Sequence, residues 1–149
     1  MRPAHHTEPR LAVSSLKCGL LPINQDAGRF YNRIGYHDHE GVSLELGERK
    51  RLLASIGDHR ALILRNHGLL TVGRSIAEAF ALMCQLEKGC IAQIMANARS
   101  ADDPHIIMPS PELCEHSAQK RWAINDKSEE VRWPALVRWI DKESPGFRD

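Results

Sequence analysis

Two short apolar runs, separated by a polar interruption, form the clearest pattern in the chain. Residues Ala61 to Leu64 and Leu69 to Val72 have the length and side-chain branching of buried strands. Between the runs lie Asn66, His67 and Gly68, which favour a turn or a bulge. The pattern therefore predicts two adjacent strands, with His67 held at a strand end.

Segments with apolar residues at three- and four-residue steps surround this pair and predict helices. The expected helices cover residues 8–18, 24–31, 48–56, 75–98 and 111–122, and a short strand covers 34–36. Ser75 and Glu78 form a capping box at the start of the longest helix. Its apolar stripe is expected to cover the sheet and comprises Ile76, Ala79, Phe80, Met83, Leu86, Cys90 and Ile94.

This alternation of short strands and amphipathic helices predicts an α/β fold. We expect a mainly antiparallel central sheet with helices on its faces, in one domain over residues 1–149. The segment from Val131 to Trp139 adds several large apolar side chains close to the end of the sequence. Such a segment is expected to dock onto a neighbouring chain as much as onto its own core.

Composition narrows the function only slightly. The 20 basic and 19 acidic residues give a net charge of +1, so no overall charge attracts nucleic acid or acidic lipid. The sequence contains no apolar run long enough for a membrane span or a secretion signal, and the four cysteines form no C-x-x-C pair. We therefore expect a cytoplasmic protein with free thiols, with Cys18 a candidate reactive thiol because Lys17 is adjacent.

Two histidine patterns are candidates for metal binding. Neutral imidazole is a common zinc ligand, and His67 beside Gly68 would be presented from rigid sheet. A single histidine in a hairpin is nevertheless more often structural than a ligand. His37 and His39 share the i, i+2 spacing that places two rings on one face of a strand, but the glycines around them indicate a loop.

Several motifs together resemble the class II aldolase/adducin family. The residues around Asn66-His67-Gly68 are similar to that family's third metal-ligand segment. The other sequence segments that carry this resemblance are AVS at 12–14, KCGLLPI at 17–23, RFY at 29–31, YHD at 36–38, EG at 40–41, WPAL at 133–136 and PGFRD at 145–149. The resemblance covers nearly the whole chain, but it corresponds to about the second half of the family's domain, so we expect the N-terminal part to be lacking.

The resemblance implies a metal site held by three histidines and an acid/base glutamate. His67 matches one ligand, His6 matches a second, and Ala4 falls where the family has the remaining histidine. His5 is adjacent but would point to the opposite face from His6 on an extended segment. The family's glutamate and its phosphate-binding residues would precede Met1, so we expect zinc or another divalent metal to bind weakly or not at all, and no catalytic residue is assigned.

Three functions remain open at this point. The resemblance implies a zinc-dependent aldol-type lyase for small hydroxy-carbonyl, sugar-derived substrates, impaired or inactive as this chain. A second interpretation is a non-catalytic, adducin-like assembly or cytoskeleton-type interaction module, which would suit the tryptophan-rich C-terminal segment. A third is a decayed gene fragment. In either of the first two cases the resemblance implies self-association, as a homotetramer.

Overall fold

The computed structural model describes residues 8–41, 46–123 and 128–147, without the side chains of 46, 48 and 128–130. Its three strands are β1 (Gly35–His37), β2 (Ala61–Leu64) and β3 (Gly68–Thr71), in the order β1-β2-β3. The strands predicted on either side of the Asn66-His67-Gly68 interruption are both present.

The α/β class is confirmed, but the described sheet is mixed, whereas a mainly antiparallel sheet was expected. Strands β2 and β3 are antiparallel, with Leu62 opposite Leu70, because a tight turn joins them. Strands β1 and β2 are parallel, with Tyr36 opposite Ile63. The connection between them contains the helix α3 (Leu46–Ile56), and such a crossover returns the chain in the same direction.

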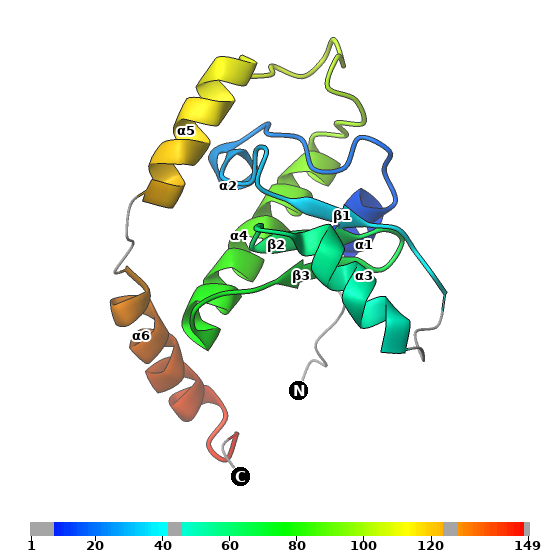
Figure 1. The fold of residues 1–149 in the computed structure, drawn as a ribbon. Helices are drawn as coiled ribbons and strands as arrows, with labels where there is room; N and C mark the ends of the chain where they lie inside the picture. The colour runs from blue at the N-terminus through cyan, green and yellow to red at the C-terminus, as the bar shows by residue number, and fades with distance from the viewer. Residues whose placement is uncertain (1–7, 42–45, 124–127, 148–149) are drawn as a thin grey trace.

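The helices cover both sides of this small sheet (Figure 1). Helix α3 contacts β1 and β2 and lies in front of the sheet, while α4 (Ile76–Met95) contacts β2 and β3 from behind. The remaining helices are α1 (Glu8–Ser14), α2 (Gln25–Gly28), α5 (Pro111–Ala123) and α6 (Ser128–Glu143). Both α1 and α2 pack against α4.

Alternate residues of β2 anchor the core on α4. Ala61 packs in a cluster with Leu82, Leu86 and Phe30. Ile63, two residues further along the strand, packs with Val13 and Cys90. This alternation is the two-residue period of a strand that has one face on a helix.

The buried side of α4 differs from the predicted stripe. Leu86 and Cys90 are buried as expected, but Ile76 is 78% exposed and Phe80 is 45% exposed. The side that faces the core comprises Leu82, Leu86, Gly89, Cys90 and Gln93. Most of this helix is apolar around its whole circumference, so its periodicity does not select one face.

The first two helices are shorter than expected. Helix α1 ends at Ser14 rather than near Cys18, because the hydroxyls of Ser14 and Ser15 both donate to the carbonyl of Leu11 and compete with the helical pattern. Helix α2 ends at Gly28, although Asn24 caps it as predicted by accepting a hydrogen bond from the Ala27 N–H.

The last helix extends away from the sheet (Figure 1). It contacts α4 through an edge-to-face pair of Trp133 and Phe80, whose ring centroids are 5.6 Å apart. Its other large side chains include Trp139, which is 60% exposed, and Val131, which is 73% exposed. The predicted C-terminal docking segment is therefore a helix that leaves much of its apolar surface open in this single chain.

Candidate functional site

The candidate site is built on the turn between β2 and β3. Asn66 has φ 57° and Gly68 has φ 147°, so the backbone passes through two residues with left-handed or glycine-favoured geometry. The N–H of His67 donates to the carbonyl of Leu64 at 3.1 Å. The turn predicted from the polar interruption is thus confirmed, and His67 is at its centre.

Neighbouring segments fix this turn from outside. The Asn66 N–H donates to the carbonyl of Ser14 at 3.3 Å, and its side-chain amide donates to the Ser15 hydroxyl at 3.3 Å. The Arg65 guanidinium donates to the carbonyl of Leu16 at 2.6 Å and lies 4.3 Å above the ring of Tyr36. These contacts hold the turn against the end of α1 and against β1, which gives the backbone of His67 a defined position.

The side chain of His67 is exposed. His6, its predicted partner, lies outside the described residues, together with Ala4 and His5. Within residues 8–41, 46–123 and 128–147, no group of three His, Cys, Asp or Glu side chains is placed to hold a metal ion. At this turn the described residues supply the imidazole of His67 and do not complete a metal site by themselves. The pairing of His6 with His67 stays a prediction.

His37 and His39 do not share an environment. His37 is only 7% exposed, and its Nδ1 is 2.9 Å from the Ser55 hydroxyl oxygen on α3. His39 is exposed, beyond the end of β1. His37 is the last residue of β1, so the loop expected around this pair begins only after it. The buried contact with Ser55 gives the His37 ring a structural role.

An open depression of about 420 Å³ adjoins the turn. Its lining combines two cations, Lys17 and Arg65, with one carboxylate, Asp38, and several hydroxyl and amide groups, which could orient a small polar molecule. The lining residues are Ser14, Ser15, Leu16, Lys17, Asp38, His39, Arg65 and Asn66. No local sequence pattern marks Arg65 or the two serines as site residues, because their contacts join segments about fifty residues apart.

Cys18 is not an activated thiol. Burial raises its pKa, and this effect outweighs its backbone hydrogen bond, the charge of Arg65 and the contact with Gln93. The suggestion that Lys17 makes Cys18 reactive is therefore wrong. Burial also raises the pKa of Cys114, and it raises the pKa of Cys90 to about 12. These three thiols are protonated near neutral pH.

Comparison with known proteins assigns the family. The family model described as Class II Aldolase and Adducin N-terminal domain matches residues 4–94. The chain belongs to this family. It is 37% identical over 145 residues to a Caulobacter vibrioides protein named for aldolase class 2, covering 97% of this chain and 55% of that protein. It is also 36% identical over 107 residues to alpha-adducin of Rattus norvegicus, covering 71% of this chain and 14% of alpha-adducin.

Solved structures agree with this assignment. The structure of an aldolase II superfamily protein from Pseudomonas syringae has a TM-score of 0.86 and 39% identity, covering 97% of this chain and 57% of that one. The L-fuculose 1-phosphate aldolase of Glaciozyma antarctica PI12 has a TM-score of 0.68 and 25% identity, covering 93% of this chain and 51% of the enzyme. The chain thus spans about half the length of the bacterial relatives it matches.

Among the described helices, none combines the length and the apolar character needed to cross a bilayer.

Proposed function

We propose that this chain carries part of a class II aldolase-type lyase site that acts on small hydroxy-carbonyl compounds. The observation that supports this most directly is the exposed His67 on a turn held by Ser14, Ser15 and Leu16. The similarity to an L-fuculose 1-phosphate aldolase supports the same class of reaction. We further propose that metal affinity and activity are low in the isolated chain, because Ala4 stands where the resemblance expects a histidine.

His67 and His6 are the residues that would hold zinc or another divalent metal. When bound, such a metal would act as a Lewis acid on the substrate carbonyl and the developing enediolate. Two protein imidazoles leave the remaining positions of a tetrahedral zinc to water or to a neighbouring chain, so affinity falls below that of a three-histidine site. The chain's own contribution is to orient the ligand: the Arg65 and Asn66 contacts hold the backbone of the turn on which His67 is presented.

Titration with zinc tests the proposal. We compare the unmodified chain with His6→Ala and His67→Ala, and we use His116→Ala as the matched control, because His116 is an exposed histidine on α5. Weak zinc binding should be lost or reduced about tenfold or more in both site variants, since each removes a coordination bond. The control should bind as the unmodified chain does. Binding that survives His67→Ala would place the metal elsewhere and overturn the proposal.

A second candidate function is a non-catalytic assembly module. The similarity to alpha-adducin and the exposed Trp139 and Val131 of α6 favour it. Assembly through apolar surface does not require a metal, so the molar mass in solution should stay the same with zinc or with EDTA. A molar mass that rises with zinc and falls with EDTA would instead favour a zinc site shared between chains. If the chain cleaves a hydroxy-carbonyl substrate and His67→Ala abolishes this cleavage, the lyase function is favoured.

A further inference from the structure

A pocket of about 370 Å³ lies between α4, α5 and α6, away from the His67 turn. Figure 1 shows α5 and α6 on one side of the molecule and α1, which contacts that turn, on the other. We call this hollow the basic pocket. Its lining residues are Asp26, Phe80, Ala81, Cys84, Gln85, Lys88, Arg121, Arg132 and Leu136.

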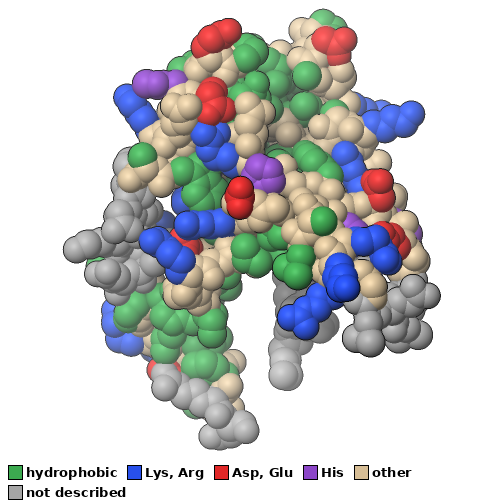
Figure 2. All heavy atoms as spheres, in the orientation of Figure 1, with side chains coloured by type: hydrophobic (Ala, Val, Ile, Leu, Met, Phe, Trp, Pro, Cys, Tyr) green, Lys and Arg blue, Asp and Glu red, His purple; other side chains and the backbone are tan. Residues whose placement is uncertain are grey.

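Positive charge dominates this lining. Lys88, Arg121 and Arg132 face one acidic residue, Asp26. None of these three cations forms an ion pair with a carboxylate among the described residues. The chain as a whole carries a net charge of only +1, so the excess of cations here is local. Figure 2 shows basic side chains gathered on the left, above the hydrophobic side chains on α6.

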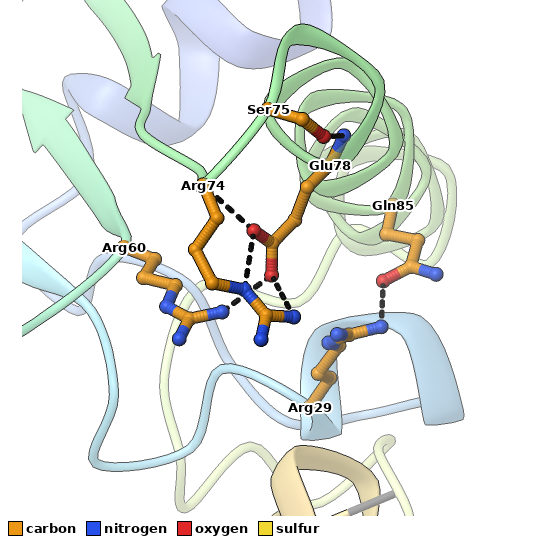
Figure 3. Close-up of polar contacts among 6 residues, drawn as sticks. All are labelled: Arg29, Arg60, Arg74, Ser75, Glu78 and Gln85. Carbon is orange, nitrogen blue, oxygen red and sulfur yellow. Dashed lines mark hydrogen bonds and ion pairs between the residues drawn. The ribbon is translucent and has the colours of Figure 1, made fainter. Parts of the chain in front are cut away.

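The hydrogen-bonding groups of the pocket are mainly donors. The Gln85 carbonyl oxygen accepts from Arg29 at 2.8 Å, which leaves the Gln85 amide N–H groups for other acceptors (Figure 3). The Arg121 guanidinium is held by the Gln25 side-chain oxygen at 3.2 Å. Two donors are therefore oriented by neighbours before any ligand arrives, which reduces the entropy lost on binding.

Two guanidinium groups near the start of α4 pair with one carboxylate. Arg60 and Arg74 share the single carboxylate of Glu78, as Figure 3 shows. Burial favours the neutral form of Glu78, but hydrogen bonds from Arg74 and the charges of Arg60 and Arg74 outweigh it and keep the pKa below its usual range. Arg29 lies 4.8 Å above the ring of Trp122. Two guanidinium groups for one carboxylate leave a local excess of positive charge near the start of α4, and positive charge attracts anions.

We propose that the basic pocket binds a small organic phosphate. A phosphate monoester dianion would balance the excess of two positive charges in the lining, and its oxygens accept from guanidinium forks and from an ammonium group. Phe80, Ala81 and Leu136 form an apolar wall beside the cations, suited to an aromatic or aliphatic group attached to the phosphate. The expected ligand is therefore a phosphate monoester that carries an aromatic or aliphatic group.

Calorimetry on the full chain tests this with two probes, phenyl phosphate and inorganic phosphate. Phenyl phosphate should bind more tightly, and the Lys88→Gln/Arg132→Gln double variant should weaken it by about tenfold or more, since both charges contact the dianion. Arg138→Gln is the matched control, because Arg138 lies on α6 outside the lining. The control should stay within about twofold of the unmodified chain. Leu136→Ala should reduce the preference for phenyl phosphate over inorganic phosphate.

Exposed Cys84 provides an independent readout. It lines the pocket, whereas Cys90 and Cys114 are buried and Cys18 is partly buried. Bound phenyl phosphate should slow the alkylation of Cys84 by neutral iodoacetamide. The proposal is overturned if phenyl phosphate does not bind at about 10 mM, which corresponds to less than about 3 kcal/mol of binding free energy. Equal weakening by the double variant and by Arg138→Gln would overturn it as well. Zinc binding at His67 is a separate measurement, so either proposal can fail alone.

Discussion

Gln93 is a polar side chain in the core that joins α4 to the loop after α1. It is fully buried, and its carbonyl oxygen accepts from the Leu21 N–H at 2.8 Å. Its amide group donates to the carbonyl of Gly19 at 2.8 Å. Two backbone groups of an irregular loop thereby find partners in the interior, where leaving them unpaired would be costly.

Replacing this amide should destabilise the protein. In Gln93→Leu the buried Leu21 N–H loses its acceptor and the buried Gly19 carbonyl keeps only the weak Cys18 thiol donor, so the free energy of unfolding should fall by about 2–4 kcal/mol. Urea denaturation followed by circular dichroism measures the change. Lys120→Leu, at an exposed position of α5, is the control and should change stability by less than about 0.5 kcal/mol. Equal stability of the two variants would show that water replaces the amide.

The carboxylate of Glu115 on α5 accepts hydrogen bonds from three side chains and forms an ion pair with Arg33. Arg33 donates to its two carboxylate oxygens at 2.6 and 3.2 Å, and Asn32 and Gln119 donate to it as well. The Arg33 hydrogen bonds, as the main cause, lower the pKa of Glu115 to about 2. The pair ties α5 to the segment between α2 and β1.

This pair predicts part of the acid sensitivity of the protein. The folded pKa of Glu115 lies below its ordinary value of 4.5, so the stability it contributes is fully present above that value. It is lost as the pH falls through 4.5 toward about 2. Glu115→Gln and Arg33→Gln should both flatten the fall in melting temperature over this range. Glu143→Gln, at an exposed position of α6, should keep the full slope. A slope unchanged in Glu115→Gln would contradict the assignment.

Among the secondary-structure elements, α4 has the most clearly defined start. The Ser75 hydroxyl accepts a hydrogen bond from the Glu78 N–H at 3.1 Å, as the capping-box pattern predicted. The Glu78 carboxylate reaches one residue further back than that pattern predicts and accepts from the Arg74 N–H at 2.6 Å. This start positions a helix that contacts two strands and three other helices.

Removing the cap should cost a moderate amount of stability. Ser75→Ala leaves the Glu78 N–H without its side-chain acceptor, and we expect a loss of about 1 kcal/mol in the free energy of unfolding. Ser117→Ala is the matched control within α5, where alanine favours the helix and stability should stay equal or rise slightly. Thermal and urea denaturation measure both variants. A loss of the same size at Ser117 would argue against a capping role for Ser75.

These elements also show which parts of the fold local patterns could predict. The β2 and β3 strands, their turn and the Ser75 cap each depend on neighbouring residues, and all were predicted. The parallel pairing of β1 with β2 depends on the crossover through α3, which no strand pattern encodes. The buried face of α4 depends on which neighbours cover an almost uniformly apolar helix. Gln93 was missed because its partners Gly19 and Leu21 lie more than seventy residues upstream.

The candidate site also has one part that the local sequence predicts and another that only the tertiary structure reveals. His67 and its turn were predicted from a local pattern together with a family resemblance, and the turn is confirmed. The contacts that position it come from Ser14, Ser15 and Leu16, which only the tertiary structure brings to the turn. The basic pocket is formed by four segments, and each of its cations alone has the sequence pattern of an ordinary solvated residue.

For the whole molecule, the open apolar surface on α4 and α6 predicts self-association, with the tetramer implied by the family resemblance as the expected state. Ile76, Val131 and Trp139 are exposed in the single chain, and a large apolar side chain contributes about 1.5–3 kcal/mol when it is fully buried. The double variant Val131→Ser/Trp139→Ser should therefore shift the assembly toward monomer, as light scattering coupled to size exclusion can measure. Ile107→Ser is the control, because Ile107 is exposed on the connector before α5. A monomeric unmodified chain, or an assembly that the double variant leaves intact, would refute the prediction.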